Sequence, residues 1–229
     1  MTGSPLNHGT PTDDRSVRST RTILVTGFGP FPGAPFNPTG PLVGRLSRKR
    51  HPALANVRIV PHIFTTSYEC VDGELPALIA RHRPEALLMF GLATRSRHVR
   101  IETLARNTLS AIPDASGRVA AASQIDAGAQ GLRAICAPDD DLLQAARRSR
   151  IPARLSRDAG SYLCNYLYWR ALEAAASVQG PHLAAFIHIP DSRHIVVKGR
   201  RRRNFVFGDL VRTGDHILRA LVTALPAQR

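Results

Sequence analysis

The sequence has little cysteine, and the spacing of its cysteines argues against the structures that cysteines usually build. The 229 residues include three cysteines, Cys70, Cys136 and Cys164, which lie far apart in the chain. An odd number of isolated cysteines does not make a disulfide framework, and without CxxC pairs or a His/Cys cluster no metal site is expected. The chain is long enough to bury a sizeable core without such staples.

Long apolar runs are also missing. No stretch approaches the roughly 20 apolar residues that a membrane span needs. The start of the chain, MTGSPLNHGTPTDDRSVRSTR, has no apolar segment of the kind that a signal peptide carries. The composition of residues 1–20 predicts a disordered tail, which leaves residues 21–229 as one domain of ordinary size. We therefore expect a soluble protein of the cytoplasm that has no membrane partner.

Negative charge is scarce, with 17 acidic residues against 31 Lys and Arg and a formal net charge of +14. Such an excess can attract nucleic acid or a membrane surface, and four consecutive arginines stand at Arg200–Arg203. Few aromatic residues interleave with this run, although a platform for single-stranded nucleic acid needs them for base stacking. All but two of the basic residues are arginines scattered over the chain, so a compositional bias explains the charge better than nucleic-acid binding.

The chain does contain a regular alternation of apolar runs with amphipathic stretches. The expected strands or extended segments are residues 21–28, 56–64, 85–93, 97–107, 131–138, 151–156 and 182–190. The expected helices are residues 39–48, 67–82, 139–150, 161–177 and 209–225, the second of them starting or bending at Pro76. Alternating strands and helices predict an α/β fold with a mainly parallel sheet and helices on both faces.

Three reactive side chains fall where α/β folds bind their ligands, beyond the carboxyl ends of strands or at the starts of helices. His188 lies near the end of AAFIHIP, and Glu102 lies in the middle or latter part of HVRIETLA. Cys164 stands at the start of a helix, where unpaired N–H groups and the helix dipole favour a thiolate. Together they have the chemistry of a nucleophile, a base and an orienting acid, although each alone is also an ordinary packing or surface residue.

The glycine-rich stretch TGFGPFPGAPFNPTG, residues 26–40, is the most unusual segment of the chain. Its glycines do not form GxGxxG and no lysine follows them, so a nucleotide site is poorly supported. Two aromatic residues, Phe28 and Phe31, belong to this strand-to-helix loop. Aromatic side chains displayed there would suit a small, flat apolar ligand, but they could equally fold back onto the core.

Four stretches together resemble pyroglutamyl peptidase type I, a family of cysteine peptidases that remove an N-terminal pyroglutamate. The segments are ILVTGFGPFPGAPFNPTG, RIETLARNTLSAIPDASG, AGSYLCNYLYW and AAFIHIP, and they occur in the family's order over residues 22–190. The resemblance implies a single open α/β/α sandwich with a mostly parallel, mixed sheet. It also implies a peptide substrate with a blocked N-terminus, no cofactor, and assembly into tetramers or dimers.

The resemblance also implies roles for individual residues. Cys164 corresponds to the nucleophile, His188 to the general base and Glu102 to the acid that orients the imidazole. The implied substrate-binding residues are Phe28 and Phe31, which match aromatic residues that pack on the pyrrolidone ring, Asn37 in the same loop, and Gly91, which matches a glycine of the oxyanion and lactam site.

The chain departs from the family pattern around this implied site. The arginine that usually precedes Ile-Pro-Asp is absent, and Arg106 is a nearby candidate to replace it. The family's GQAGGR loop becomes GLATRSR, residues 91–97, which removes a glycine pair and adds charge. These changes predict a remodelled pocket, so the preferred acyl group is less firmly specified than the thiol chemistry.

Three functions from different classes therefore compete. The leading one is a cysteine peptidase or amidase that acts on blocked N-termini. A second is a relative that binds a small molecule or a protein partner without turnover, having lost the supporting arginine. A third is an RNA-associated protein that uses the basic run at residues 198–203.

Overall fold

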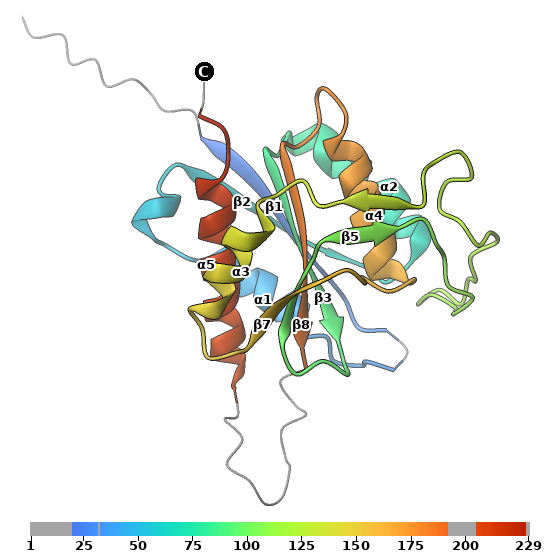
Figure 1. The fold of residues 1–229 in the computed structure, drawn as a ribbon, viewed down its shortest axis with the longest axis horizontal. Helices are drawn as coiled ribbons and strands as arrows, with labels where there is room; N and C mark the ends of the chain where they lie inside the picture. The colour runs from blue at the N-terminus through green and yellow to red at the C-terminus, as the bar shows by residue number, and fades with distance from the viewer. Residues whose placement is uncertain (1–19, 32, 192–204, 228–229) are drawn as a thin grey trace, which may run out of the picture.

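The computed structural model describes residues 20–31, 33–191 and 205–227 of the chain (Figure 1). The predicted disordered tail, apart from Thr20, and the arginine run Arg200–Arg203 lie outside these described residues. Among the described residues, no helix has the length and apolarity that crossing a bilayer requires.

A mixed sheet runs through the middle of the described chain, with strands in the order β2-β1-β3-β8-β4-β7. Its members are β1 (Arg21–Phe28), β2 (Val57–Phe64), β3 (Ala86–Ala93), β4 (Val99–Glu102), β7 (Ala153–Ser156) and β8 (Leu183–Pro190). Only the β4–β8 pair is antiparallel in this sheet. The predicted α/β fold with a mostly parallel, mixed sheet is confirmed.

Helices cover both faces of the sheet: α1, α3 and α5 lie on one face, and α2 and α4 on the other (Figure 1). Their bounds are α1 (Thr39–Leu46), α2 (Tyr68–His82), α3 (Asp139–Arg147), α4 (Leu163–Ala175) and α5 (Phe207–Thr223), with a 3-10 turn at Pro52–Leu54. Because side chains alternate across a strand, Ile23 and Val25 enter one apolar core while Leu24 enters the other. This double burial explains why the central strands are apolar along their whole length.

Three expected elements differ from the structure in detail. The single strand expected at residues 97–107 is divided into β4 in the main sheet and β5 (Leu104–Arg106) outside it. Residues 131–138 contain only the short strand β6 (Leu132–Ala134), which pairs antiparallel with β5 in a separate small sheet. Leu132 and Ala134 of β6 are exposed, so this strand lacks the apolar burial of a central strand. Helix α2 begins at Tyr68, so Pro76 lies inside the helix and does not mark its start.

The sheet brings several chain segments together at the carboxyl ends of its central strands. Because β1, β3 and β8 are parallel, their carboxyl ends lie together, and these ends carry Phe28, Gly91 and His188. The first turn of α4, with Cys164 as its second residue, reaches the same end of the sheet beside Gly91. Open α/β sheets bind their ligands at the carboxyl ends of the strands, so a ligand is expected here.

Candidate active site

A cavity of about 410 Å³ opens at the carboxyl ends of the central strands, and Cys164 and His188 both line it. One half of the cavity comes from the end of β1, the segments after β1 and β2, and the residue before α4. This aromatic half is defined here as Phe28, Phe31, Asn37, Thr66 and Tyr162. Strands β4 and β7 and the loop before β4 supply the cationic half of the cavity, defined here as Arg95, Ser96, His98, Arg100 and Arg154. Since β8 lies between β3 and β4 in the sheet, His188 stands where the two halves meet.

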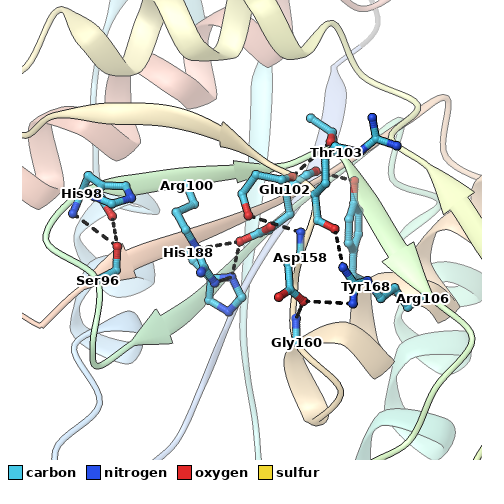
Figure 2. Close-up of polar contacts among 12 residues, drawn as sticks. Ser96, His98, Arg100, Glu102, Thr103, Arg106, Asp158, Gly160, Tyr168 and His188 are labelled. Carbon is cyan, nitrogen blue, oxygen red and sulfur yellow. Dashed lines mark hydrogen bonds and ion pairs between the residues drawn. The ribbon is translucent and has the colours of Figure 1, made fainter.

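Glu102 and His188 form a buried pair, of which His188 lines the cavity and Glu102 does not. The Glu102 side chain is 0% exposed, and its Oε1 lies 2.7 Å from Nδ1 of His188 (Figure 2). With Glu102 ionised, Nδ1–H donates to Oε1 and leaves the lone pair of the imidazole on Nε2. Antiparallel pairing of β4 with β8 puts the two residues on neighbouring strands, so the backbone fixes the contact.

Arg100 is a site residue that the sequence reasoning missed. Its Nε lies 2.9 Å from Oε1 of Glu102, and its Nη2 lies 3.1 Å from Nδ1 of His188 (Figure 2). Residues two apart in a strand share a face, so the alternation of Val99 and Ile101 with polar residues already put Arg100 on the face of Glu102. That alternation was the available signal.

The charges around His188 act in opposite directions on its pKa. Burial lowers the pKa of His188 below its ordinary value, and the positive charge of Arg100 lowers it further. The ionised Glu102 raises the pKa but does not overcome these effects. A neutral imidazole at neutral pH is the form that a general base needs.

Cys164 packs against the backbone of β3. A Cβ atom added at Gly91 would lie 2.8 Å from the Cys164 Sγ and equally close to the Phe186 ring, so only glycine leaves room for the thiol. Among the described residues, no hydrogen bond joins Sγ to His188, although both line the cavity. Catalytic hydrogen bonds often shorten only when substrate binds.

The surroundings of the Cys164 thiol act mainly to raise its pKa. Burial raises its pKa to about 12, the negative charge of Glu102 raises it too, and Arg100 only partly opposes them. Cys164 is partly exposed, and the stabilisation of a thiolate by the helix start stays a prediction, because it acts against the burial that raises the pKa of the thiol.

The aromatic half is held in shape by buried hydrogen bonds. Asn37 Nδ2 donates to the Gly29 carbonyl (3.1 Å), and Asn37 Oδ1 accepts from the Thr39 N–H (3.1 Å) and lies 2.8 Å from Thr39 Oγ1. Thr39 Oγ1 also accepts from the Phe28 N–H (3.0 Å) and lies 3.0 Å from the Phe28 carbonyl, so its single proton goes either to that carbonyl or to Asn37 Oδ1. Phe28, Phe31 and Asn37 thus reach the cavity together, with the Asn37 amide engaged in bracing the loop.

Arg106, the sequence candidate for a supporting arginine, is absent from the residues that line the cavity. Its guanidinium donates to the Arg157 carbonyl (3.3 Å) and lies 3.9 Å from Asp158 (Figure 2). Its main chain exchanges two hydrogen bonds of 2.8 Å with the Asn165 side chain, next to Cys164 in α4. The guanidinium contacts neither Glu102 nor His188, and its role stays a prediction.

No group of three or more metal-binding side chains occurs within the described parts of the chain. A larger hollow of about 800 Å³ lies between α2 and α4, but its lining includes neither Cys164 nor His188. The chemistry therefore concentrates in the smaller cavity.

Comparison with known proteins identifies the family. The sequence model described as pyroglutamyl peptidase matches residues 21–203. This chain belongs to the pyroglutamyl peptidase family. The resemblance carried by the four motifs is confirmed, and the cavity described above lies within the matched region.

Individual members of the pyroglutamyl peptidase family agree over most of the chain. Pyrrolidone-carboxylate peptidase of Pyrococcus furiosus is 32% identical over 170 residues, which cover 73% of this chain and 80% of that protein. Pyrrolidone-carboxylate peptidase 1 of Streptococcus pneumoniae serotype 4 is 30% identical over 201 residues, covering 87% and 92%.

Solved structures of family members have the same fold. Pyrrolidone carboxyl peptidase from Thermococcus litoralis superimposes with a TM-score of 0.79 at 25% identity, covering 89% of this chain and 94% of that one. Pyroglutamyl peptidase I of Bacillus amyloliquefaciens gives a TM-score of 0.75 at 26% identity, covering 90% and 97%.

Proposed function

We propose that this protein is a cysteine peptidase that removes an N-terminal pyroglutamyl residue from peptides through a thioester intermediate. The observation that carries the proposal is the convergence of Cys164 with the Glu102–His188 pair on one cavity, in a chain of the pyroglutamyl peptidase family. Phe28 and Phe31 in the same cavity supply flat apolar surface for the lactam ring.

In the acylation step, Cys164 Sγ attacks the pyroglutamyl carbonyl carbon while His188 Nε2 takes the thiol proton. Proton transfer during attack suits a thiol whose pKa burial has raised to about 12. The developing oxyanion lies near the first turn of α4, whose N–H groups have no intrahelical acceptors. One such donor contributes about 10²–10³-fold to kcat in other acyl transfers.

The tetrahedral intermediate then collapses as the C–N bond breaks. The imidazolium of His188 gives its proton to the departing amine, and a thioester joins the acyl group to Cys164. Water next attacks the thioester carbonyl, with His188 Nε2 accepting the water proton and returning it to the sulfur. Free pyroglutamate leaves, and Glu102 stabilises the imidazolium in both halves of the cycle.

Selectivity for a blocked N-terminus has a simple physical origin. A lactam is uncharged, whereas an ordinary N-terminus is an ammonium group that an aromatic pocket would have to desolvate. Arg95 and Arg154 in the cationic half, which have no carboxylate partner among the described residues, disfavour an ammonium further by charge repulsion.

The test is turnover of a fluorogenic pyroglutamyl amide by the wild-type protein and by the Cys164→Ala variant. We expect release of the fluorophore by the wild type and only background release by the variant. Turnover that survives Cys164→Ala would reject the mechanism. A proline amide substrate, which has the ring but no lactam carbonyl, is the specificity control and should not be cleaved.

A second candidate function is binding without turnover. It is favoured by one observation: Arg100 contacts both Glu102 and His188 and could hold the pair in an inactive charge state. Absence of turnover together with stoichiometric binding of pyroglutamate would select this candidate. Assembly into dimers or tetramers also stays a prediction, which light scattering of the purified chain tests.

A further inference from the structure

Strand pairing puts three cationic or titratable side chains in one row across the sheet. Arg100 is the register partner of His188 on β8 and also of Arg154 on β7. Side chains directly opposite on neighbouring strands point to the same face. With strands spaced about 4.8 Å apart, the row reaches roughly 10 Å from His188 to Arg154 along the floor and rim of the cavity.

The members of this row differ in their charge partners. Arg100 is neutralised by Glu102, but Arg154 and Arg95 have no carboxylate partner among the described residues. Both are exposed and line the same cavity, and the described lining contains no acidic side chain. The charge of Arg154 also acts on His98, where burial and then Arg154 and Arg100 lower the pKa of the imidazole.

The chemistry of the proposed reaction assigns a side of the cavity to each part of the substrate. The acyl group belongs in the aromatic half, over β1 and its loop. The leaving amine takes its proton from His188, so the leaving peptide extends past His188 toward β4 and β7. Its first residue therefore meets the cationic half, where Arg95 and Arg154 offer unpaired guanidinium groups.

We propose that the cationic half selects substrates with a carboxylate on the first residue of the leaving peptide, and that Arg154, assisted by Arg95, is the specificity-determining residue. This inference rests on the proposed function. Two sources supply that carboxylate: the C-terminus of a pyroglutamyl dipeptide, or the side chain of an aspartate or glutamate. Guanidinium groups bind carboxylates in a planar two-point geometry that an amide cannot match.

The first measurement compares kcat/KM for pyroglutamyl-alanine and pyroglutamyl-alanine amide, which differ only at the C-terminal group. We expect the acid to be favoured about fivefold, the upper range for a solvent-exposed ion pair. Arg154→Gln should bring the ratio close to one, and Arg95→Gln should reduce it less. Arg48→Gln is the matched control because it removes the same charge at an exposed position after α1, and it should keep the wild-type ratio.

A second arm identifies the source of the carboxylate. Pyroglutamyl-glutamate amide and pyroglutamyl-glutamine amide compare a side-chain carboxylate with its neutral isostere. Preference for the acid in this arm alone assigns the site to acidic side chains, whereas preference only in the first arm assigns it to dipeptides. Either preference should weaken as salt is raised, since an exposed ion pair is screened.

The possible outcomes distinguish failure of this inference from failure of the proposed peptidase function. Turnover of all four substrates with acid-to-amide ratios near one would overturn the inference and leave the proposed function intact. Without any turnover, calorimetric binding of the same pairs to Cys164→Ala decides: preference for the acid that Arg154→Gln removes supports the inference. Equal affinities, or no binding of either member, would overturn it.

Discussion

The two halves of the cavity are built in different ways. Three of the five residues of the aromatic half, Phe28, Phe31 and Asn37, come from one segment of the chain, which is braced by hydrogen bonds among Asn37, Thr39, Phe28 and Gly29. The cationic half gathers side chains from β4, β7 and the loop before β4, and its exposed arginines are held mainly by strand register. The aromatic half contains part of the segment that resembles the family's opening motif, whereas the cationic half contains part of the loop GLATRSR, which departs from the family pattern.

This difference in construction separates recognition of the acyl group from preference for the leaving group. A loop braced by its own buried polar groups tolerates little change, because a broken bond leaves a buried group unsatisfied. Exposed side chains on a rigid sheet can change with little cost to folding. We therefore expect the aromatic half to determine which acyl group binds. The cationic half should determine which leaving group is preferred.

The largest effect is expected from Glu102→Gln, which removes the charge that both His188 and Arg100 contact. The imidazole loses its orienting partner and Arg100 becomes an uncompensated charge. We expect kcat/KM for the fluorogenic amide to fall about 10³-fold. Glu69→Gln, at an exposed ion pair with Arg118, is the matched control. Activity within tenfold of wild type would remove Glu102 from the mechanism.

A second prediction concerns Gly91 of β3, against which Cys164 packs. In Gly91→Ala the new methyl group would meet the Cys164 sulfur and the Phe186 ring, so the sulfur must move. A displacement of about 1 Å in a reacting group costs on the order of 10²-fold in rate. Gly44→Ala, whose Cβ meets nothing within 4 Å, should leave kcat/KM unchanged. Equal rates for the two variants would contradict the packing described for Cys164.

Arg100→Gln tests how the cationic half acts on the chemistry. Burial and Arg100 lower the pKa of His188, so the wild-type acid limb of kcat/KM should have its midpoint below pH 6.5. Removing Arg100 raises the pKa of His188, so the imidazole becomes protonated at higher pH. The acid limb should therefore move to higher pH in Arg100→Gln and stay in place in Arg48→Gln. If the acid limb of the kcat/KM profile stays in place or moves to lower pH in Arg100→Gln, Arg100 does not lower the pKa of His188.

The smallest effect is expected from Arg106→Ala. Its guanidinium contacts Asp158 and the Arg157 carbonyl at the surface, and its main-chain bonds to Asn165 survive the substitution. We expect kcat/KM to fall by less than about fivefold, as for an exposed ion pair. A loss of more than tenfold at unchanged thermal stability would support the role that the sequence suggested for Arg106.

The sequence predicts the aromatic half better than the cationic half. Phe28, Phe31 and Asn37 belong to one short segment, so their proximity follows from chain connectivity. Arg100 could have been found from strand alternation, because it is two residues from Glu102. Arg154 could not, because its position depends on the pairing of β7 with β4, and strand order cannot be derived from a four-residue strand.

The thiol chemistry shows another limit of local reasoning. The helix start at Cys164 was predicted within two residues, but the burial that raises the pKa of the thiol was not, because it depends on how α4 packs on β3. Likewise, residues 131–138 were recognised as extended, but nothing local indicated that they pair with β5 outside the main sheet. Both failures concern long-range packing, not element type.

The central claim is that Cys164 forms a thioester with the pyroglutamyl group. Rapid acid quenching of the wild-type protein mixed with a pyroglutamyl thioester or activated ester, followed by intact-protein and peptide mass spectrometry, measures it directly. We predict a mass increase of one pyroglutamyl group on the peptide containing Cys164, absent in Cys164→Ala and accumulating in Glu102→Gln as deacylation slows. Product formation with no adduct on Cys164, or an adduct on Cys70 or Cys136 instead, would contradict the mechanism.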